Sequence, residues 1–171
     1  YLAIVHGVPD PPEGRLETLI GRHPVHRQRM AVLQKGGRRA VTRYTVAETF
    51  RDAALLRVAI ETGRTHQIRV HMRHIGCPVA GDATYGNAKA DAALPLPPSR
   101  QMLHAWRLAF PHPVHGGAIE IEAPPPADFT AAKLSRYARS SLRPRANTSR
   151  RMNSGTTIRS RNSKREKTAW P

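Results

Sequence analysis

One segment of this chain reads Glu61-Thr62-Gly63-Arg64-Thr65-His66-Gln67-Ile68-Arg69-Val70-His71, directly after the apolar run Ala54-Leu55-Leu56-Arg57-Val58-Ala59-Ile60. From Leu56 onward apolar and polar residues alternate, which predicts a strand. Gly63 then predicts a turn, and Thr65 is a suitable N-cap for a helix. We expect this helix over residues 66–75, because Gly76 and Pro78 are typical helix-ending residues.

The expected helix has two distinct stripes. Ile68, Met72 and Ile75 follow one another at helical spacing and predict a packed apolar stripe. Arg69 and Arg73 share a different face, which we expect to be exposed and available to an anion. A glycine turn before a helix that carries a constant positive charge is an arrangement suited to meeting an anionic partner.

With the residues that follow, this segment resembles the signature of the RluA/RluD-type pseudouridine synthases. Further stretches resemble the family in the same order along the chain, from residue 1 to about residue 129. The stretches that carry the resemblance are Tyr1–Gly7, Ile20–Pro24, Ala40–Tyr44, Glu61–His71, Ile75–Pro78, Gly81–Gly86, Leu103–Ala105 and Phe110–Pro113.

One part of the family pattern has no counterpart in these 171 residues. The family's catalytic aspartate belongs to a motif that reads roughly His-Arg-Leu-Asp, upstream of the tyrosine strand, and the chain contains no such motif. The chain also begins with Tyr1 rather than Met. We therefore expect it to be the later portion of a catalytic domain, without its own nucleophile.

The resemblance implies a mixed α/β (α+β) fold, the pseudouridine synthase catalytic domain in part, with a largely antiparallel central sheet. It also implies isomerisation of uridine to pseudouridine in RNA, with no cofactor and no metal. We favour ribosomal RNA over transfer RNA as the substrate, although the sequence alone does not decide between them, and we expect no obligate protein partner. Two alternatives stay open. One is a non-catalytic RNA-binding module that keeps the synthase cleft, and the other is a basic globular protein that meets nucleic acid through its tail.

The resemblance assigns catalytic roles to Tyr1 and Arg69. The family tyrosine lies beside the target base, where its ring can stack and its hydroxyl can reach a proton. The family arginine pairs with the catalytic aspartate, because a guanidinium holds a carboxylate through two bonds and keeps it ionised. Residues expected to bind RNA are Arg64, Thr65, His66, Gln67, Arg73, Arg22 and Arg43, with Arg27, Arg29, Arg38 and Arg39 as further phosphate contacts.

Charge is distributed unevenly along the chain. The net charge is +16, and residues 135–171 hold 11 of the 28 Lys and Arg residues but one of the 12 Asp and Glu residues. We expect 1–134 to be the partial catalytic domain and 135–171 to be a disordered basic tail that contacts phosphates. A tail without a selected role is the alternative.

Cysteine usage and hydropathy bear on location. A single cysteine, Cys77, excludes an internal disulfide and fits a reducing compartment, so we expect a cytoplasmic protein. No apolar run of membrane-spanning length occurs, and we expect no membrane association.

Other chemistry is possible for residues in the signature. His66, His71, His74 and Cys77 resemble metal ligands, but His66 and His71 point in different directions on a helix, so we expect hydrogen-bonded or solvent-facing histidines. Residues 81–86 lack the lysine and the helix start of a phosphate-binding P-loop. We expect this turn to lie beside the start of the Arg69 helix, with Asp82 holding the turn rather than acting as the nucleophile.

Overall fold

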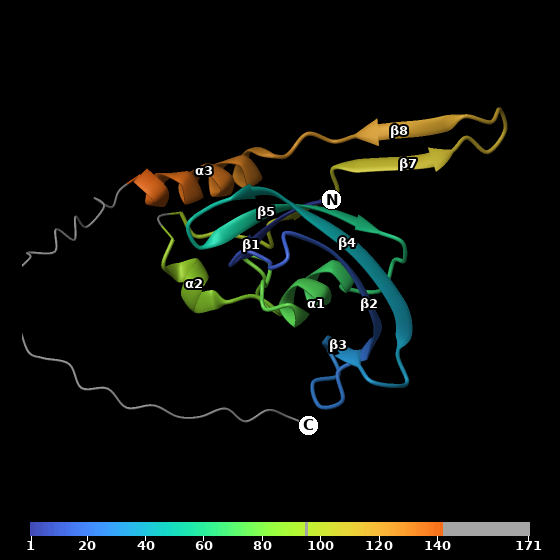
Figure 1. Ribbon diagram of the computed structural model, residues 1–171, viewed down its shortest axis with the longest axis horizontal. Coiled ribbons are helices and arrows are strands. Elements are labelled where there is room, and N and C mark those ends of the chain that lie inside the picture. Colours follow the sequence, from blue (N-terminus) through green and yellow to red (C-terminus); the bar gives the residue numbers. More distant parts are fainter. Residues whose placement is uncertain (95, 142–171) are drawn as a thin grey trace, which may run out of the picture.

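The computed structural model describes residues 1–94 and 96–141 and centres on a six-stranded antiparallel sheet (Figure 1). The strand order in this sheet is β3-β2-β4-β5-β1-β6, and β7 and β8 form a separate two-stranded ribbon. Every strand pair is antiparallel, as expected. The elements are β1 (Leu2–His6), β2 (Glu13–Arg22), β3 (Met30–Leu33), β4 (Arg38–Thr49), β5 (Ala53–Ile60), α1 (Gln67–His74), α2 (Ala88–Ala92), β6 (Leu103–His104), β7 (Arg107–Pro111), β8 (Ala118–Glu122) and α3 (Ala127–Ser141).

The central strands are apolar on both faces because each face is covered by a helix. Alternate residues of β1 and β5 point to opposite sides of the sheet. One side packs on α1 through a cluster that includes Val5, Leu56 and Met72. The other side packs on α3 through a cluster that includes Ile4 and Phe129. The β7–β8 ribbon projects away from this body (Figure 1).

Several elements match the expectations from sequence, and others were missed. The sequence pattern predicts strands over residues 1–6, 38–49, 55–60, 103–110 and 118–123, and a second helix over 128–136. The long strand β4 has its predicted bounds, and β5 begins at Ala53. The expected single strand over residues 103–110 is interrupted between β6 and β7, where Trp106 packs against the α3-side cluster. The pattern did not predict β2, β3 or α2. Prolines precede β2 and glycines interrupt it, so its alternation is weak.

The helix α1 begins later than expected and without a side-chain cap. Its N-cap residue is His66, not Thr65, and His66 makes no side-chain capping hydrogen bond. His66 has φ 56° and ψ 20°, the left-handed conformation that non-glycine residues rarely adopt. At the other end Gly76 has φ 77°, which confirms its role in ending the helix.

After α1 the chain reverses and returns along the helix, as the sequence predicts. His6 donates its backbone N–H to the carbonyl of Pro78, and Ala80 donates to Ile4, so the returning segment is held against β1. Gly81 has φ 70°, and a Cβ there would overlap the carbonyl oxygen of Arg100. The turn at residues 81–86 therefore requires glycine at this position.

The boundary expected at residue 135 falls inside α3, whose backbone continues to Ser141. Residues 142–171, which carry most of the expected basic tail, lie outside the described residues. In the part of the chain that the structure describes, no helix is long and apolar enough to cross a membrane.

Candidate functional site

Arg69 and Asp82 form a buried, two-pronged ion pair. Arg69 Nε donates to Asp82 Oδ2 and Arg69 Nη2 donates to Oδ1, each at 2.7 Å. The Arg69 side chain is 13% exposed and the Asp82 side chain is fully buried. The expectation of an exposed arginine stripe is therefore wrong at this position. Arg69 Nη1 has no hydrogen-bond partner among the described residues, so one edge of the guanidinium remains available.

Asp82 also holds the turn in which it lies, as expected. Its Oδ1 accepts the backbone N–H groups of Thr84 at 2.9 Å and of Tyr85 at 3.0 Å. Burial alone would raise the pKa of Asp82, but hydrogen bonds from Arg69, Tyr85 and Thr84 outweigh it and keep the pKa below its ordinary value. Asp82 is thus an ionised carboxylate that orients Arg69.

Tyr85 contacts both arginines of α1 and also His66, the residue that precedes the helix. The Arg69 guanidinium lies over the Tyr85 ring, 4.9 Å from its centroid. Arg73 Nη1 donates to the Tyr85 carbonyl at 3.0 Å. The Tyr85 hydroxyl lies 2.9 Å from His66 Nδ1. This contact confirms that the turn at residues 81–86 returns to the start of α1.

Tyr85 and burial together shape the surroundings of His66. The Tyr85 hydroxyl accepts the backbone N–H of Met30 at 2.8 Å and is also hydrogen-bonded to His66 Nδ1. Desolvation first, and then the positive charge of Arg69, lowers the pKa of His66. His66 is therefore predominantly neutral at pH 7. Its left-handed backbone places strain at this point of the site.

Gln67 and His71 turn inward and connect α1 to the sheet. Gln67 Nε2 donates to Val41 O and Thr42 Oγ1, each at 2.9 Å, and its Oε1 accepts from Thr62 Oγ1 and the Arg64 backbone. Thr42 Oγ1 is also hydrogen-bonded to His71 Nδ1 at 2.8 Å, and His71 Nε2 is hydrogen-bonded to Thr18 Oγ1 at 2.8 Å, so both ring nitrogens of His71 have a partner. Gln67 is 3% exposed, which argues against its expected contact with RNA.

This network predicts that stability decreases as the solution becomes acidic. Burial lowers the pKa of His71 from 6.5 to about 4. The unfolded chain thus binds a proton near pH 6.5 that the folded chain binds only near pH 4. The contribution of the neutral His71 to the free energy of unfolding is fully present above pH 6.5. The free energy of unfolding falls by about 3 kcal/mol as the pH drops toward 4. Urea unfolding at several pH values should show this loss, and His71→Gln should reduce it.

The matched control for this prediction is His26→Gln, because His26 is exposed on the loop between β2 and β3. The control should keep the wild-type dependence on pH. An unchanged pH dependence in His71→Gln would show that another group is responsible.

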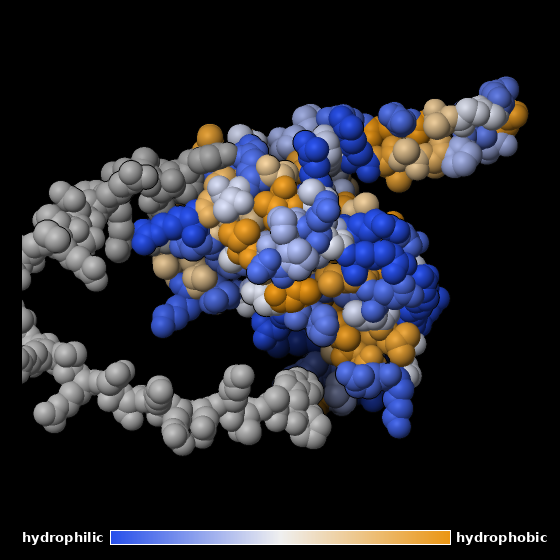
Figure 2. All heavy atoms as spheres, in the orientation of Figure 1, coloured by the Kyte–Doolittle hydropathy of each residue, from blue (hydrophilic) through white to orange (hydrophobic). Residues whose placement is uncertain are grey.

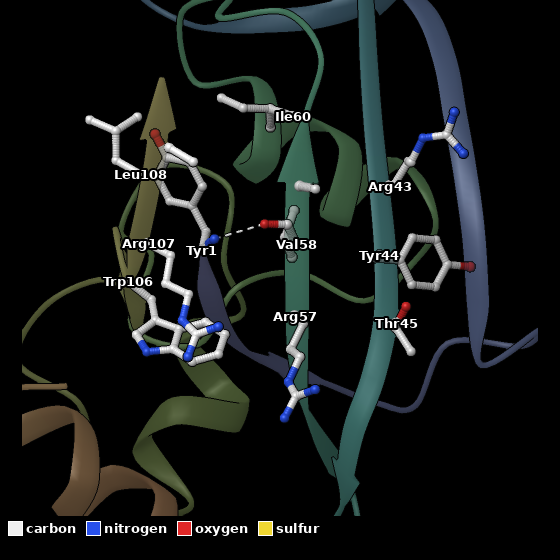
Figure 3. A pocket seen from close by; sticks show the side chains of 12 residues that line it. Tyr1, Arg43, Tyr44, Thr45, Arg57, Val58, Ile60, Trp106, Arg107 and Leu108 are labelled. Carbon is white, nitrogen blue, oxygen red and sulfur yellow. Dashed lines mark hydrogen bonds between the residues drawn. The ribbon is translucent and has the colours of Figure 1, made fainter. Parts of the chain in front are cut away.

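Tyr1 lies at the end of the sheet where α1 begins. Its amine donates to the Val58 carbonyl at 2.8 Å, and it packs against the cluster that contains Ile68 and Met72. Tyr1 borders a groove of about 500 Å³ (Figure 3). No hydrogen bond joins Tyr1 to Arg69 in the described residues. The groove is lined by Tyr1, Arg43, Tyr44, Thr45, Arg57, Val58, Ala59, Ile60, Trp106, Arg107, Leu108 and Ala109.

Basic side chains gather where the β2–β3 loop faces the returning turn. A pocket of about 460 Å³ is lined by His26, Arg27, Gln28, Arg29, Ala83 and Thr84. A second pocket, of about 270 Å³, shares Arg29 and adds Arg73, His23 and His74 beside Tyr85. None of the residues that line either pocket is acidic. We name the residues His23, His26, Arg27, Arg29 and Arg73 the basic track.

The other residues expected to bind RNA occupy varied positions. Thr65 is exposed. Arg64 donates from Nε to the Arg39 carbonyl at 2.9 Å, and Arg22 donates to the Arg27 carbonyl at 3.4 Å. Arg43 is exposed but pairs with Glu61 at 2.7 Å, and Arg39 pairs in the same way with Glu17 at 2.6 Å. Such exposed pairs are weak and can exchange for phosphate.

Sequence reasoning missed the roles of Tyr85 and Trp106. The sequence predicts Tyr85 only as part of a turn, although it is the one aromatic residue there. Nothing local predicts its contacts with His66, Arg69 and Arg73. Among the described residues, no group of three or more His, Cys, Asp or Glu side chains could hold a metal ion. His71 and the buried Cys77 are packed in the interior.

Comparison with known proteins identifies relatives that share one kind of name, RNA or ribosomal pseudouridine synthase. Residues 1–74 match the sequence profile of the family described as RNA pseudouridylate synthase. The chain is 48% identical to "Ribosomal large subunit pseudouridine synthase D" of Nitrosomonas europaea over 136 residues, which is 77% of this chain and 38% of that protein. It is 49% identical to "Uncharacterized RNA pseudouridine synthase" of Chloroflexus aurantiacus over 129 residues, covering 75% of this chain and 39% of that protein.

A solved structure shares the fold. "Human RNA Pseudouridylate Synthase Domain Containing 1" superimposes with a TM-score of 0.63 at 28% identity, over 72% of this chain and 52% of that chain. This likeness agrees with the mixed α+β architecture and its curled antiparallel sheet. The chain spans less than half the length of the curated relatives described above.

Proposed function

Because the chain belongs to the RluA/RluD-type family of RNA pseudouridine synthases, we propose that it forms the RNA-gripping and arginine-bearing part of such an enzyme. The substrate is uridine in RNA, and the relatives named for the large ribosomal subunit favour ribosomal RNA. The reaction takes place in the cytoplasm and needs neither cofactor nor metal.

The observation that carries this proposal is the orientation of Arg69. Asp82 binds the Nε and Nη2 edge of the guanidinium, and Tyr85 lies under its plane. The Nη1 edge is left for a second carboxylate. An arginine held in this way can keep a catalytic aspartate ionised and aimed, at little entropic cost when the aspartate arrives.

In the proposed reaction the target nucleotide leaves its stack and enters the site. The aspartate, supplied by polypeptide outside these 171 residues, assists cleavage of the N-glycosidic bond. The freed uracil rotates and rejoins the ribose through C5, and the C5 proton is then lost. Tyr1 stacks beside the base, and the neutral His66 offers a ring nitrogen for hydrogen bonding near Arg69.

The first test measures conversion by the chain itself. The 171 residues contain no His-Arg-Leu-Asp motif, and the one carboxylate bound to Arg69 also holds a turn. We expect the purified chain to bind ribosomal RNA but to release no tritium from RNA labelled at C5 of uridine, whereas the longer protein that contains it does. Tritium release by the 171-residue chain would contradict this division of roles.

A second candidate function is a non-catalytic RNA-binding module. The observation that favours it is that Arg69 already has a carboxylate partner within the chain, Asp82. If the longer protein also released no tritium while it bound RNA, this second candidate would replace the first.

The basic track gives a separate prediction for RNA binding. Arg27→Gln with Arg29→Gln should weaken binding of a ribosomal RNA fragment. The change should also reduce the slope of log affinity against log salt, by about 0.7 for each single-strand phosphate that the variant no longer neutralises. Filter binding across a salt series measures both effects.

The matched control for the basic track is Arg51→Gln, because Arg51 is exposed in the turn between β4 and β5. This variant removes one positive charge and should leave the salt slope close to that of the wild type. Equal slopes for the track variant and the wild type would show that RNA binds elsewhere.

A further inference from the structure

Tyr85 is buried between α1 and the part of the sheet that carries the basic track. Its side chain packs in one cluster with Val70 of α1 and Ile20 of β2, and it is 4% exposed. It also lines the pocket of about 270 Å³ that Arg29 and Arg73 of the basic track share. Figure 2 shows hydrophilic side chains beside an apolar strip at the end of the body where β3 lies. Tyr85 thus lies directly beneath the surface that we expect RNA to contact.

The Tyr85 hydroxyl holds the end of the β2–β3 loop. This loop is closed by a hydrogen bond from the His23 backbone N–H to the Arg29 carbonyl at 2.9 Å. The N–H of the same peptide group belongs to Met30, and it donates to the Tyr85 hydroxyl at 2.8 Å. Both polar groups of this peptide are therefore bonded, one within the loop and one to Tyr85. The Arg29 side chain branches from the backbone next to this peptide, so its position depends on the Tyr85 hydroxyl.

The remainder of Tyr85 holds the two arginines of α1. The Arg69 guanidinium lies over the Tyr85 ring at 4.9 Å from its centroid, and the Tyr85 carbonyl accepts from Arg73 Nη1 at 3.0 Å. The Tyr85 backbone N–H donates to Asp82 Oδ1 at 3.0 Å, and Asp82 in turn binds Arg69. The ring and the arginine are therefore positioned by one turn. A single residue contacts both the loop of the basic track and the arginine of the site.

We propose that Tyr85 is a positioning residue that links RNA binding by the basic track to the orientation of Arg69. Its hydroxyl holds the β2–β3 loop so that Arg27 and Arg29 meet phosphates, and its ring keeps the Arg69 guanidinium at a fixed tilt. RNA that is bound by its phosphates is then placed at a constant separation from Arg69, which favours the reactive geometry. This inference rests on the proposed function, because it takes the basic track as the RNA contact and Arg69 as the partner of a catalytic carboxylate.

The role of the hydroxyl is tested on the 171-residue chain with a ribosomal RNA fragment. Tyr85→Phe removes the hydroxyl and keeps the ring. It should speed hydrogen exchange at the Met30 amide and weaken RNA binding by about three- to tenfold, the effect of one or two hydrogen bonds. In a chain that already carries Arg27→Gln with Arg29→Gln, the same change should weaken binding by less than about twofold, because the side chains that it positions are gone.

Tyr44→Phe is the matched control for this comparison. Tyr44 is also buried, and its hydroxyl donates to the Pro11 carbonyl at 3.2 Å. Whatever Tyr44→Phe does to RNA binding, its effect should be the same with and without the two arginines of the track. A tyrosine that only stabilised the fold would behave in this additive way.

The role of the ring is tested in the longer enzyme proposed above. At saturating RNA, Tyr85→Phe should keep the single-turnover rate within about twofold of the wild type, because the ring still lies under Arg69. Tyr85→Leu should lower this rate by about five- to thirtyfold, the range of a desolvated cation–π contact. Rates are compared at a temperature at which circular dichroism shows every variant to be folded. The hydroxyl then affects RNA affinity and the ring affects the rate, a division that loss of stability does not produce.

Two results would overturn the proposal. One is an effect of Tyr85→Phe on RNA binding that is absent, or that is equal with and without Arg27 and Arg29. The other is an equal rate at saturating RNA for Tyr85→Phe and Tyr85→Leu. RNA binding is measured on the chain alone, so a longer protein that releases no tritium would overturn the proposed function while the link between Tyr85 and the basic track is still confirmed or refuted.

Discussion

Replacing Asp82 by Asn is expected to lower the free energy of unfolding by about 3–5 kcal/mol, because it leaves the buried Arg69 charge without its partner. The asparagine Oδ1 can still accept the backbone N–H groups of Thr84 and Tyr85, so this variant isolates the loss of charge. Asp82→Ala removes the turn hydrogen bonds as well and should cost about 1–3 kcal/mol more. Urea unfolding at pH 7 measures each value.

The exposed pair of Arg100 and Asp128 provides a matched control. It has the same two-pronged geometry, with distances of 2.6 and 2.9 Å, but its side chains are 39% and 41% exposed. Asp128→Asn should therefore cost no more than about 1 kcal/mol. Equal losses in Asp82→Asn and Asp128→Asn would mean that burial does not strengthen the Arg69 pair.

The same pair predicts how acid acts on the fold. The pKa of Asp82 is below its ordinary value in the folded chain, so its contribution is complete above pH 3.8 and is lost as the pH falls through the lower, folded value. This loss begins where that of His71 ends, near pH 4. The free energy of unfolding should thus fall over two successive pH ranges, and Asp82→Asn should remove the fall in the lower range.

In the longer enzyme proposed above, replacing Arg69 by Lys is expected to reduce the rate of pseudouridine formation by about 10²–10³, with RNA affinity changed by less than about threefold. Lysine is a single charged point, so it cannot bind Asp82 through two parallel bonds and offer a further edge to a second carboxylate. It also loses the stacking of the guanidinium on the Tyr85 ring. Single-turnover tritium release and filter binding separate the effects on rate and affinity.

Arg100→Lys is the matched control for this rate measurement, because the Arg100 side chain makes the same kind of pair with Asp128 of α3, on the opposite side of the sheet from α1. Its rate should equal that of the wild type. A fully active Arg69→Lys variant would show that Arg69 only supports the turn at residues 81–86. Loss of rate together with loss of thermal stability would require comparison at a temperature where both proteins are folded.

Local sequence determined the elements that carry the site. The alternation before Ile60, Gly63 in the turn, and Gly76 with Pro78 predicted a strand, a turn and a helix in order, because each depends on conformational preferences of neighbouring residues. The same pattern indicated that the chain reverses after α1. The cap was missed, because His66 in a left-handed conformation is stabilised by Tyr85, which lies 19 positions away.

The tertiary structure alone decided which side chains meet. Arg69 and Asp82 are 13 positions apart, His71 and Thr18 are 53 apart, and no periodicity connects either pair. The helical pattern could not distinguish Gln67, whose side chain contacts the sheet, from Arg73, whose side chain contacts Tyr85 in the turn at residues 81–86. The sequence by itself determined the strand, turn and helix around the site, because these depend on the conformational preferences of neighbouring residues. The orientation of Arg69, the buried His71 network and the exposed ribbon depend instead on how the sheet packs against helices from distant parts of the chain.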